Sequence, residues 1–314
     1  MSLSGLCTLA AGLGCEVRYN EPLSAHTTFK VGGECEAFIE IASADALVRL
    51  ISCARAEGVK YYVLGKGSNV VFEDRGFGGA VLHIGQQMSE IMLCGSDDPA
   101  VPDGLTGIRA DAGAGLNRLC GFACENSLTG LEFAYGIPGT VGGAVYMNAG
   151  AYGGEIVDVI YAADILDVRT GEIRTVRLDD GGFGLSYRCS TFMDNGDIIL
   201  RAYFALPAGD SKEIRAKMDD LLSRRKEKQP LDFPSAGSTF KRPEGYYAGK
   251  LIQDSGLRGF TVGGAQVSEK HCGFVINRGG ATAADITALI DHIKKTVLEQ
   301  QGVELECEVR IIPY

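Results

Sequence analysis

Hydroxyl and cationic side chains are concentrated in residues 234–243, which read PSAGSTFKRP. Basic residues flank this segment, in the run RRKEK at 224–228 and at Lys250 and Arg258, although the chain carries a formal net charge of -10. A local positive potential in an acidic protein suits a phosphorylated or carboxylated ligand. The alternative is a solvated helix face followed by a turn-rich loop, which a charge run alone favours.

Two charged residues stand next to small or apolar residues, where a charged side chain is uncommon. Arg188 follows Tyr187 in GLSYRCSTF at 184–192, among small and apolar residues. Its rigid fork of donors suits a carboxylate, and the tyrosine suits a phosphate or sugar, although a structural ion pair is an equal alternative. Glu308 precedes the stretch VRII, where a carboxylate could assist proton transfer or stabilise charge. An ion pair with Arg310 is the ordinary alternative there.

Glycine is unusually dense in two segments. Residues 136–154 read GIPGTVGGAVYMNAGAYGG, and residues 65–69 read GKGSN. Each glycine loses more backbone entropy on folding than other residues, so such clusters indicate a close approach to the backbone, for example by a large flat cofactor. In the second segment, successive amides with the Ser68 hydroxyl and the Asn69 amide could form an anion-binding nest. Tight turns explain either segment equally well when it is considered alone.

The elements that must position these residues can be predicted from local signals. A strand at 36–42 is followed by a helix that Ser43 begins and Gly58 ends. A second strand at 59–64 then runs into GKGSN, which gives a βαβ unit that leads to a candidate phosphate-binding loop. The apolar N-terminal residues predict a short helix ending at Gly12 and Gly14, not a signal peptide, because no Lys or Arg precedes Arg18.

The remainder of the chain alternates short strands with helices, which predicts an α+β protein. Five β-rich runs lie between residues 80 and 206, with a helix at 116–126. A charged amphipathic helix follows at 211–228, so a domain boundary near residue 209 is expected. A second amphipathic helix begins at Thr282 and ends at Gly302, and the alternating residues 303–313 predict a closing strand.

Composition narrows the possible functions. The 314 residues are 46% hydrophobic and include no run long enough to span a membrane. The acidic balance argues against general nucleic-acid binding. Ten scattered cysteines lack zinc or redox spacing, so buried free thiols in a reducing cytosol are expected. No metal is predicted, because the histidines at positions 26, 83, 271 and 292 lie far apart without a ligand pattern.

Seven ordered motifs over nearly the whole chain are similar to those of bacterial UDP-N-acetylenolpyruvoylglucosamine reductases. They are SAHTTFKVGG (24–33), YVLGKGSNVVF (62–72), GIPGTVGGAVYMNAGAYG (136–153), GLSYRCS (184–190), PSAGSTFKRP (234–243), AGKLIQDSGLRGF with GGAQVSEKHCGFVIN (248–277), and LECEVRII (305–312). Because the chain lacks an insertion after Tyr187 and Arg188, it resembles the compact type without an added tyrosine loop. Cys307, where many relatives have proline, departs from the pattern.

The resemblance implies an FAD-binding domain of the vanillyl-alcohol-oxidase (PCMH) type at 1–208, with subdomains of about 1–83 and 84–208. A C-terminal α+β domain at 209–314 is then expected to bind the UDP-sugar substrate. FAD is expected to be noncovalent and NADPH to be the reducing cosubstrate. The implied reaction reduces UDP-N-acetylglucosamine enolpyruvate to UDP-N-acetylmuramate for peptidoglycan.

The same resemblance implies roles for individual residues. Arg188 is expected to stabilise the enolate and carboxylate, Ser238 to deliver a proton, and Glu308 to assist. The residues expected to bind FAD are Gly65, Lys66, Gly67, Ser68, Asn69, Tyr135, Gly136, Pro138, Gly139, Gly142, Gly143, Asn148 and Gly150. Those expected to bind substrate are Tyr187, Lys228, Arg242, Arg258 and His271, although Arg242 and His271 stand where other members carry amides.

Two alternatives compete with the reductase. One is another FAD-dependent oxidoreductase of the same fold that acts on a different alcohol or lactone. The other is a flavin-free protein that binds a UDP-sugar. The expected partners are small molecules, with no nucleic acid, no membrane span and no obligatory protein partner, and the expected location is cytoplasmic. The set of Arg188, Ser238 and Glu308 favours the reductase.

Overall fold

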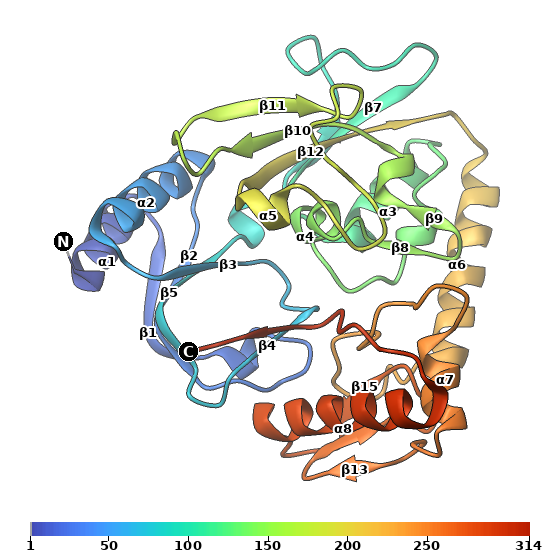
Figure 1. Ribbon diagram of the computed structural model, residues 1–314. Coiled ribbons are helices and arrows are strands. Elements are labelled where there is room, and N and C mark those ends of the chain that lie inside the picture. The colour runs from blue at the N-terminus through green and yellow to red at the C-terminus, as the bar shows by residue number, and fades with distance from the viewer. Residues whose placement is uncertain (1) are drawn as a thin grey trace. The chain divides into compact units, whose positions relative to one another are not determined.

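The computed structural model describes residues 2–314, which divide into two compact units (Figure 1). Among the described residues, the first unit comprises 2–18, Ala37–Lys66 and Gly79–Arg224, and the second comprises Tyr19–Glu36, Gly67–Gly78 and Arg225–Tyr314. Both units are therefore built from separate stretches of chain, whereas the predicted domains, 1–208 with its two subdomains and 209–314, are each continuous in sequence. The assignment of ligands to the predicted domains stays a prediction.

A four-stranded sheet has the strand order β1-β2-β5-β3. Its strands and the two helices beside it are α1 (Leu3–Gly12), β1 (Glu16–Pro22), β2 (Glu34–Glu40), α2 (Ala44–Glu57), β3 (Tyr61–Leu64) and β5 (Phe77–His83). The Ser43 hydroxyl accepts from the N–H of Ala46, and Gly58 is left-handed, so both predicted ends of α2 are confirmed. The predicted β-α-β order along the chain is present, but β3 pairs in parallel with β5, which lies between β2 and β3.

A five-stranded sheet has the order β11-β10-β12-β7-β6, and each neighbouring pair is antiparallel. Its strands and the accompanying elements are β6 (Ile91–Leu93), β7 (Thr106–Asp111), α3 (Leu116–Glu125), α4 (Val141–Tyr146), β8 (Gly150–Ala151), β9 (Gly154–Glu155), β10 (Ile160–Leu166), β11 (Ile173–Arg177), α5 (Phe192–Asn195), β12 (Ile198–Leu206) and α6 (Ser211–Lys228). All five predicted β-rich runs are strands, and α4 packs against β12 and β7.

The second unit contains a small sheet of order β13-β14-β15 against which α8 packs (Figure 1). Its elements are β4 (Val70–Phe72), α7 (Ala248–Asp254), β13 (Thr261–Val262), β14 (Ala265–Val267), β15 (Val275–Asn277), α8 (Ala283–Gln301) and β16 (Arg310–Ile312). Thr282 and Asp285 form a capping box, and Gly302 is left-handed, which confirms both predicted ends of α8. The predicted closing strand is wrong for most of 303–309, because only β16 pairs with β4 and Cys307 forms an isolated bridge with Phe240.

All ten cysteines are free, and six of them are buried, namely Cys7, Cys15, Cys35, Cys120, Cys124 and Cys272. Burial raises the pKa of the Cys120 thiol to about 12, so it is a neutral core side chain at pH 7. Cys120 and Cys124 share the buried face of α3, as their spacing predicts.

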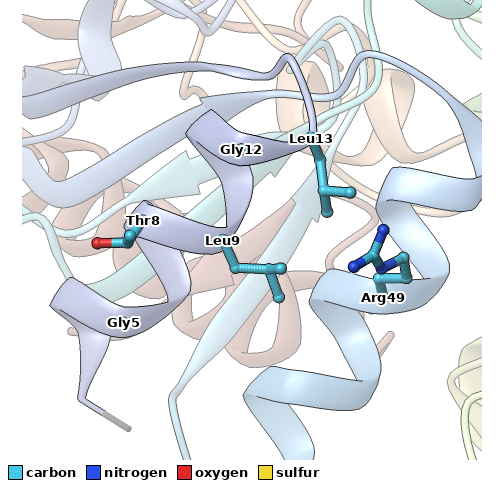
Figure 2. A pocket seen from close by; sticks show the side chains of 6 residues that line it. All are labelled: Gly5, Thr8, Leu9, Gly12, Leu13 and Arg49. Atoms are coloured by element: carbon cyan, nitrogen blue, oxygen red, sulfur yellow. The ribbon is translucent and has the colours of Figure 1, made fainter.

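A hollow of about 510 Å³ lies between α1 and α2. Figure 2 shows Arg49 of α2 facing Leu9 of α1 and Leu13, the residue that follows α1, across this hollow. Gly5, Thr8 and Gly12 complete its lining. None of the predicted site residues lines it. Within residues 2–314, no helix combines the length and the apolar character needed to cross a membrane.

Candidate active site

Arg188 occupies a strained position in a tight turn. Ser186 and Cys189 exchange two backbone hydrogen bonds, of 3.2 and 3.1 Å, and Tyr187 and Arg188 form the tip between them. Arg188 has φ 54°, a left-handed conformation that costs a non-glycine residue roughly 1–2 kcal/mol. Such strain in a polar residue is typical of functional sites. Arg188 is half-buried, its guanidinium carbon lies 5.0 Å from the Tyr187 ring centroid, and that ring is 44% exposed.

The glycine-rich run holds this turn in place. The Arg188 guanidinium donates to the carbonyls of Asn148 at 3.3 Å and of Gly150 at 3.0 Å. In return, the Asn148 amide donates to the Ser186 carbonyl at 3.1 Å, and the Ser190 hydroxyl donates to the Tyr146 carbonyl at 2.7 Å. The structure therefore brings the predicted cofactor segment and the predicted catalytic arginine into direct contact.

Asn148 is fully buried, and its side chain makes hydrogen bonds within this loop region. Its Nδ2 also donates to the Glu155 carboxylate at 2.9 Å, and its Oδ1 accepts from the N–H of Val157 at 3.0 Å. Both amide hydrogens are used inside the protein, so the Asn148 side chain has no N–H left to donate to FAD. The side chain instead organises the turn that carries Arg188.

We expect Asn148→Ala to lower the free energy of unfolding by about 2–4 kcal/mol, because three partly buried hydrogen bonds are lost. Urea unfolding followed by far-UV circular dichroism measures the change. The matched control is Asn126→Ala, because the exposed Asn126 amide donates only to the Phe122 carbonyl. Equal, small losses for both variants would show that the Asn148 hydrogen bonds contribute little.

Several predicted cofactor glycines are required by the packing of the chain against itself. A Cβ added to Gly65 would lie 2.5 Å from Thr140 Oγ1, and one added to Gly142 would lie 2.8 Å from Ala112 Cβ. A Cβ on Gly67 would collide with the His26 carbonyl oxygen, and Gly67 itself has φ 65°. Gly143 differs, because it is exposed and its nearest neighbour would be Thr140 Oγ1 at 3.6 Å. Gly143 thus leaves bare backbone on which a flat ligand could lie, so this part of the glycine-rich run fits FAD.

Residues 136–143 lie against the first turn of α3. The N–H of Leu116 donates to the Gly139 carbonyl at 3.1 Å, and Gly115 pairs with Thr140. The N–H of Gly136 donates to Asn117 Oδ1 at 2.7 Å. Tyr135 and Pro138 belong to the same loop. Because the N-terminus of a helix attracts anions, this loop is suited to the diphosphate of a dinucleotide.

Thr239 connects the segment of Ser238 to the segment of Glu308. The buried Thr239 carbonyl accepts from the N–H of Glu308 at 2.8 Å and from the Cys307 thiol at 3.4 Å. The Thr239 hydroxyl accepts from the N–H of Val275 at 3.0 Å, which ties this pair of segments to β15. Ser238 is exposed and Glu308 is half-buried. We call this arrangement the Thr239 clamp, and it brings the predicted proton donor and its predicted assistant into neighbouring backbone positions.

The glycine loop 65–69 divides between the units. Gly65 and Lys66 belong to the first unit, and Lys66 is exposed. Gly67, Ser68 and Asn69 belong to the second, where the Asn69 amide donates to the Glu308 carbonyl at 3.1 Å. Asn69, which is predicted to contact FAD, is therefore hydrogen-bonded to Glu308, which is predicted to be catalytic.

Three predicted substrate residues of the second unit are exposed, namely Lys228, Arg242 and Arg258, whereas His271 is half-buried. Arg258 donates to the Glu269 carbonyl and to Gln253 Oε1, both at 2.6 Å. Lys228 is the exposed last residue of α6, where cations are favoured by the helix dipole. The Lys270 ammonium donates to the carbonyl of Lys226 at 2.6 Å in the same helix turn. These contacts favour, for part of the basic run, the alternative in which its charges lie on a solvated helix face.

His271 is held as a neutral hydrogen-bond donor. Its Nδ1 accepts from the N–H of Gly273 at 3.1 Å, so the neutral ring carries its proton on Nε2. Burial lowers the pKa of His271 below its usual value of 6.5. At neutral pH this side chain can donate one hydrogen bond, but it supplies no positive charge.

Acidification is expected to destabilise the wild-type protein more than His271→Gln. Because the folded chain lowers the pKa of His271, the unfolded chain takes up the proton first as the pH falls below 6.5. The stability that the neutral ring provides is complete above that pH and is lost below it. Urea unfolding at pH 7.5 and pH 5.5 measures the difference. Equal losses for both proteins would contradict the assignment.

Sequence reasoning missed two exposed tyrosines beside Arg242. The Arg242 guanidinium carbon lies 4.0 Å from the Tyr247 ring centroid, and its Nε donates to the Tyr246 carbonyl at 3.3 Å. Tyr246 is 49% exposed and Tyr247 is 63% exposed. An aromatic face with a stacked cation is suited to a nucleoside base or ribose. The segment GYY at 245–247, with two adjacent tyrosines close to Arg242 in the sequence, could have indicated this contact.

Two family models match the chain. The model described as "FAD binding domain" matches residues 35–177, and the one described as "UDP-N-acetylenolpyruvoylglucosamine reductase, C-terminal domain" matches residues 229–312. UDP-N-acetylenolpyruvoylglucosamine reductase of Agathobacter rectalis is 50% identical over 295 residues, which is 93% of each chain. The chain belongs to the UDP-N-acetylenolpyruvoylglucosamine reductase family. The predicted family and the α+β fold class are thereby confirmed.

Other members of the reductase family agree. The reductase of Caldanaerobacter subterraneus subsp. tengcongensis is 46% identical over 93% of this chain and 92% of its own. The crystal structure of the reductase from Thermus caldophilus superimposes with a TM-score of 0.76 at 30% identity, over 95% of this chain and 99% of that one. These matches extend over both units, but they do not test the role of any single residue, so the residue assignments stay predictions.

Proposed function

We propose that this chain is an FAD-dependent reductase that converts UDP-N-acetylglucosamine enolpyruvate to UDP-N-acetylmuramate, with NADPH as the reductant. Family membership supports the reaction, and the observation that carries the residue assignment is the Thr239 clamp, which places Ser238 and Glu308 side by side. FAD, when bound, supplies the hydride that adds to the methylene carbon of the vinyl ether.

Hydride addition leaves negative charge on the adjacent carbon and its carboxylate. The Arg188 guanidinium stabilises this charge, since a fork of donors in a partly buried turn is oriented in advance. The hydroxyl of Ser238 then transfers its proton to the carbanion-like carbon, and the serine oxygen regains a proton from solvent. The Glu308 carboxylate assists this transfer. Serine is a weak acid in water, but a carbanion is a strong enough base to deprotonate it.

Binding assignments follow the contacts of each segment. The bare backbone at Gly143 and the loop at the first turn of α3 would hold FAD. Tyr187, Lys228, Arg242, Arg258 and His271 are proposed to bind the UDP-sugar. The exposed pair Tyr246 and Tyr247 is proposed to join them through contacts with the nucleoside.

One assay tests the function directly. Purified protein should be yellow with flavin absorbance. After the bound flavin has been reduced, it should go on consuming NADPH only when UDP-N-acetylglucosamine enolpyruvate is present. Protein that stays colourless and cannot be reconstituted with FAD would exclude a flavoenzyme and favour a sugar-binding protein. If flavin-loaded protein does not turn over the enolpyruvyl substrate, the result would favour another oxidoreductase of the same fold.

A further inference from the structure

Asn69 holds the backbone around Glu308 at two points. Its side-chain Nδ2 donates to the Glu308 carbonyl at 3.1 Å, and its own carbonyl accepts from the N–H of Arg310 at 3.0 Å. These two bonds begin the parallel pairing of β4 with β16, in which Val70 lies opposite Arg310. The peptide groups on both sides of Val309 are therefore fixed by one asparagine.

The opposite side of Glu308 is fixed by the Thr239 clamp. The N–H of Glu308 donates to the Thr239 carbonyl at 2.8 Å, so both backbone polar groups of Glu308 are bonded. When the N–H and the carbonyl of a residue are both held, the direction of its Cα–Cβ bond is set. The half-buried Glu308 side chain then has a defined starting point for its carboxylate.

We propose that Asn69 is a positioning residue that acts through Glu308. Its position in the glycine loop predicted a contact with FAD, but the hydrogen bond that its amide makes in the structure is to the Glu308 carbonyl. The inference rests on the proposed function, in which Glu308 assists the protonation of the substrate. It assigns to Asn69 an effect on the half-reaction with the enolpyruvyl substrate and none on the half-reaction with NADPH.

Asn69→Asp and Asn69→Ala test this in the full-length protein loaded with FAD. Aspartate keeps the shape but replaces the N–H donor with an acceptor, and alanine removes the donor without adding charge. We expect the Kd for FAD and the rate of NADPH-driven flavin reduction to change less than about 2-fold. We expect kcat with the enolpyruvyl substrate to fall about 10-fold, with its KM nearly unchanged. The Kd is read from flavin fluorescence.

Asn277→Asp is the matched control in the same unit. The amide of Asn277 donates to the Phe29 carbonyl at 3.1 Å, so the variant makes the same chemical change at a buried residue whose side-chain hydrogen bonds go to residues other than Glu308 and Thr239. A lower melting temperature with kcat retained is the expected result. If this control slowed turnover as much as Asn69→Asp does, the Asn69 effect would be general destabilisation and the inference would be overturned.

A double-mutant cycle with Glu308→Gln separates the remaining explanations. If Asn69 acts through Glu308, Asn69→Ala slows the wild-type protein but adds little in the Glu308→Gln background. Equal fold losses in both backgrounds, or a Kd for FAD that rises in step with the lost rate, would overturn the inference and leave the proposed function standing. A wild-type protein that does not turn over the enolpyruvyl substrate would overturn both.

Discussion

Ser238→Ala is expected to leave NADPH-driven reduction of the flavin at the wild-type rate and to slow reoxidation by UDP-N-acetylglucosamine enolpyruvate roughly 10²–10⁴-fold. This range is the usual contribution of a positioned proton donor. Alanine keeps the backbone of the Thr239 clamp, whose hydrogen bonds are made by the neighbouring residue. The change therefore removes only the hydroxyl.

Stopped-flow absorbance of the flavin measures the two half-reactions of the Ser238 variant separately. Ser235→Ala is the matched control, because Ser235 lies in the same loop and its carbonyl, which accepts from the Thr28 hydroxyl at 2.7 Å, is unchanged by the substitution. Wild-type reoxidation in Ser238→Ala would refute the assignment of Ser238 as the proton donor. Loss of both half-reactions would instead indicate damage to the flavin site.

The second large effect is expected at Arg188. Arg188→Lys keeps one positive charge but loses the planar fork, so we expect kcat/KM to fall roughly 10²–10³-fold, the usual loss when one stabilising donor is removed. Arg188→Gly should lose at least as much activity. Its stability should change by less than about 1 kcal/mol, because glycine relieves the strain at φ 54° while two hydrogen bonds to the glycine-rich run are lost.

Steady-state kinetics measures kcat/KM of the Arg188 variants, and urea unfolding measures their free energy of unfolding. Arg174→Lys is the control in the same unit, since Arg174 pairs at 3.2 Å with the buried carboxylate of Asp197 on the five-stranded sheet and belongs to no predicted site. Activity close to wild type in Arg188→Lys would show that the guanidinium fork is not required. A large loss of stability in Arg188→Gly would show that the arginine is mainly structural.

Helix ends were predictable because each depends on a few adjacent residues. Ser43 and Gly58 define α2, and Thr282 and Gly302 define α8, through hydrogen bonds that reach only three or four residues along the chain. The strand predicted at 303–313 shows the opposite case. Its alternation of side chains is real, but a strand needs a partner, and only Arg310–Ile312 meets one, at Val70–Phe72 far away in the sequence.

The candidate site was predictable as a set of motifs and not as a set of contacts. Resemblance located Arg188, Ser238 and Glu308, but neither the left-handed backbone of Arg188 nor the carbonyl of Thr239 leaves a signature in side-chain types. The glycines illustrate the same limit. Their density indicated a ligand or tight turns, whereas the nearest atom to a Cβ on Gly65 would be the Thr140 hydroxyl, a contact that no local pattern predicts.

The second unit is formed by three separate stretches of chain, and this determines when it can fold during synthesis. Phe29, Val31 and Val71 share its core with residues of α8, and the Asp74 carboxylate accepts from the first amides of that helix at 2.7 and 2.9 Å. The stretches Tyr19–Glu36 and Gly67–Gly78 therefore leave the ribosome long before their partners exist. A fragment that begins at residue 209 would lack these core side chains and the strand that pairs with β16. The early stretches of this unit therefore stay without their partners until α8 and β16 have been made.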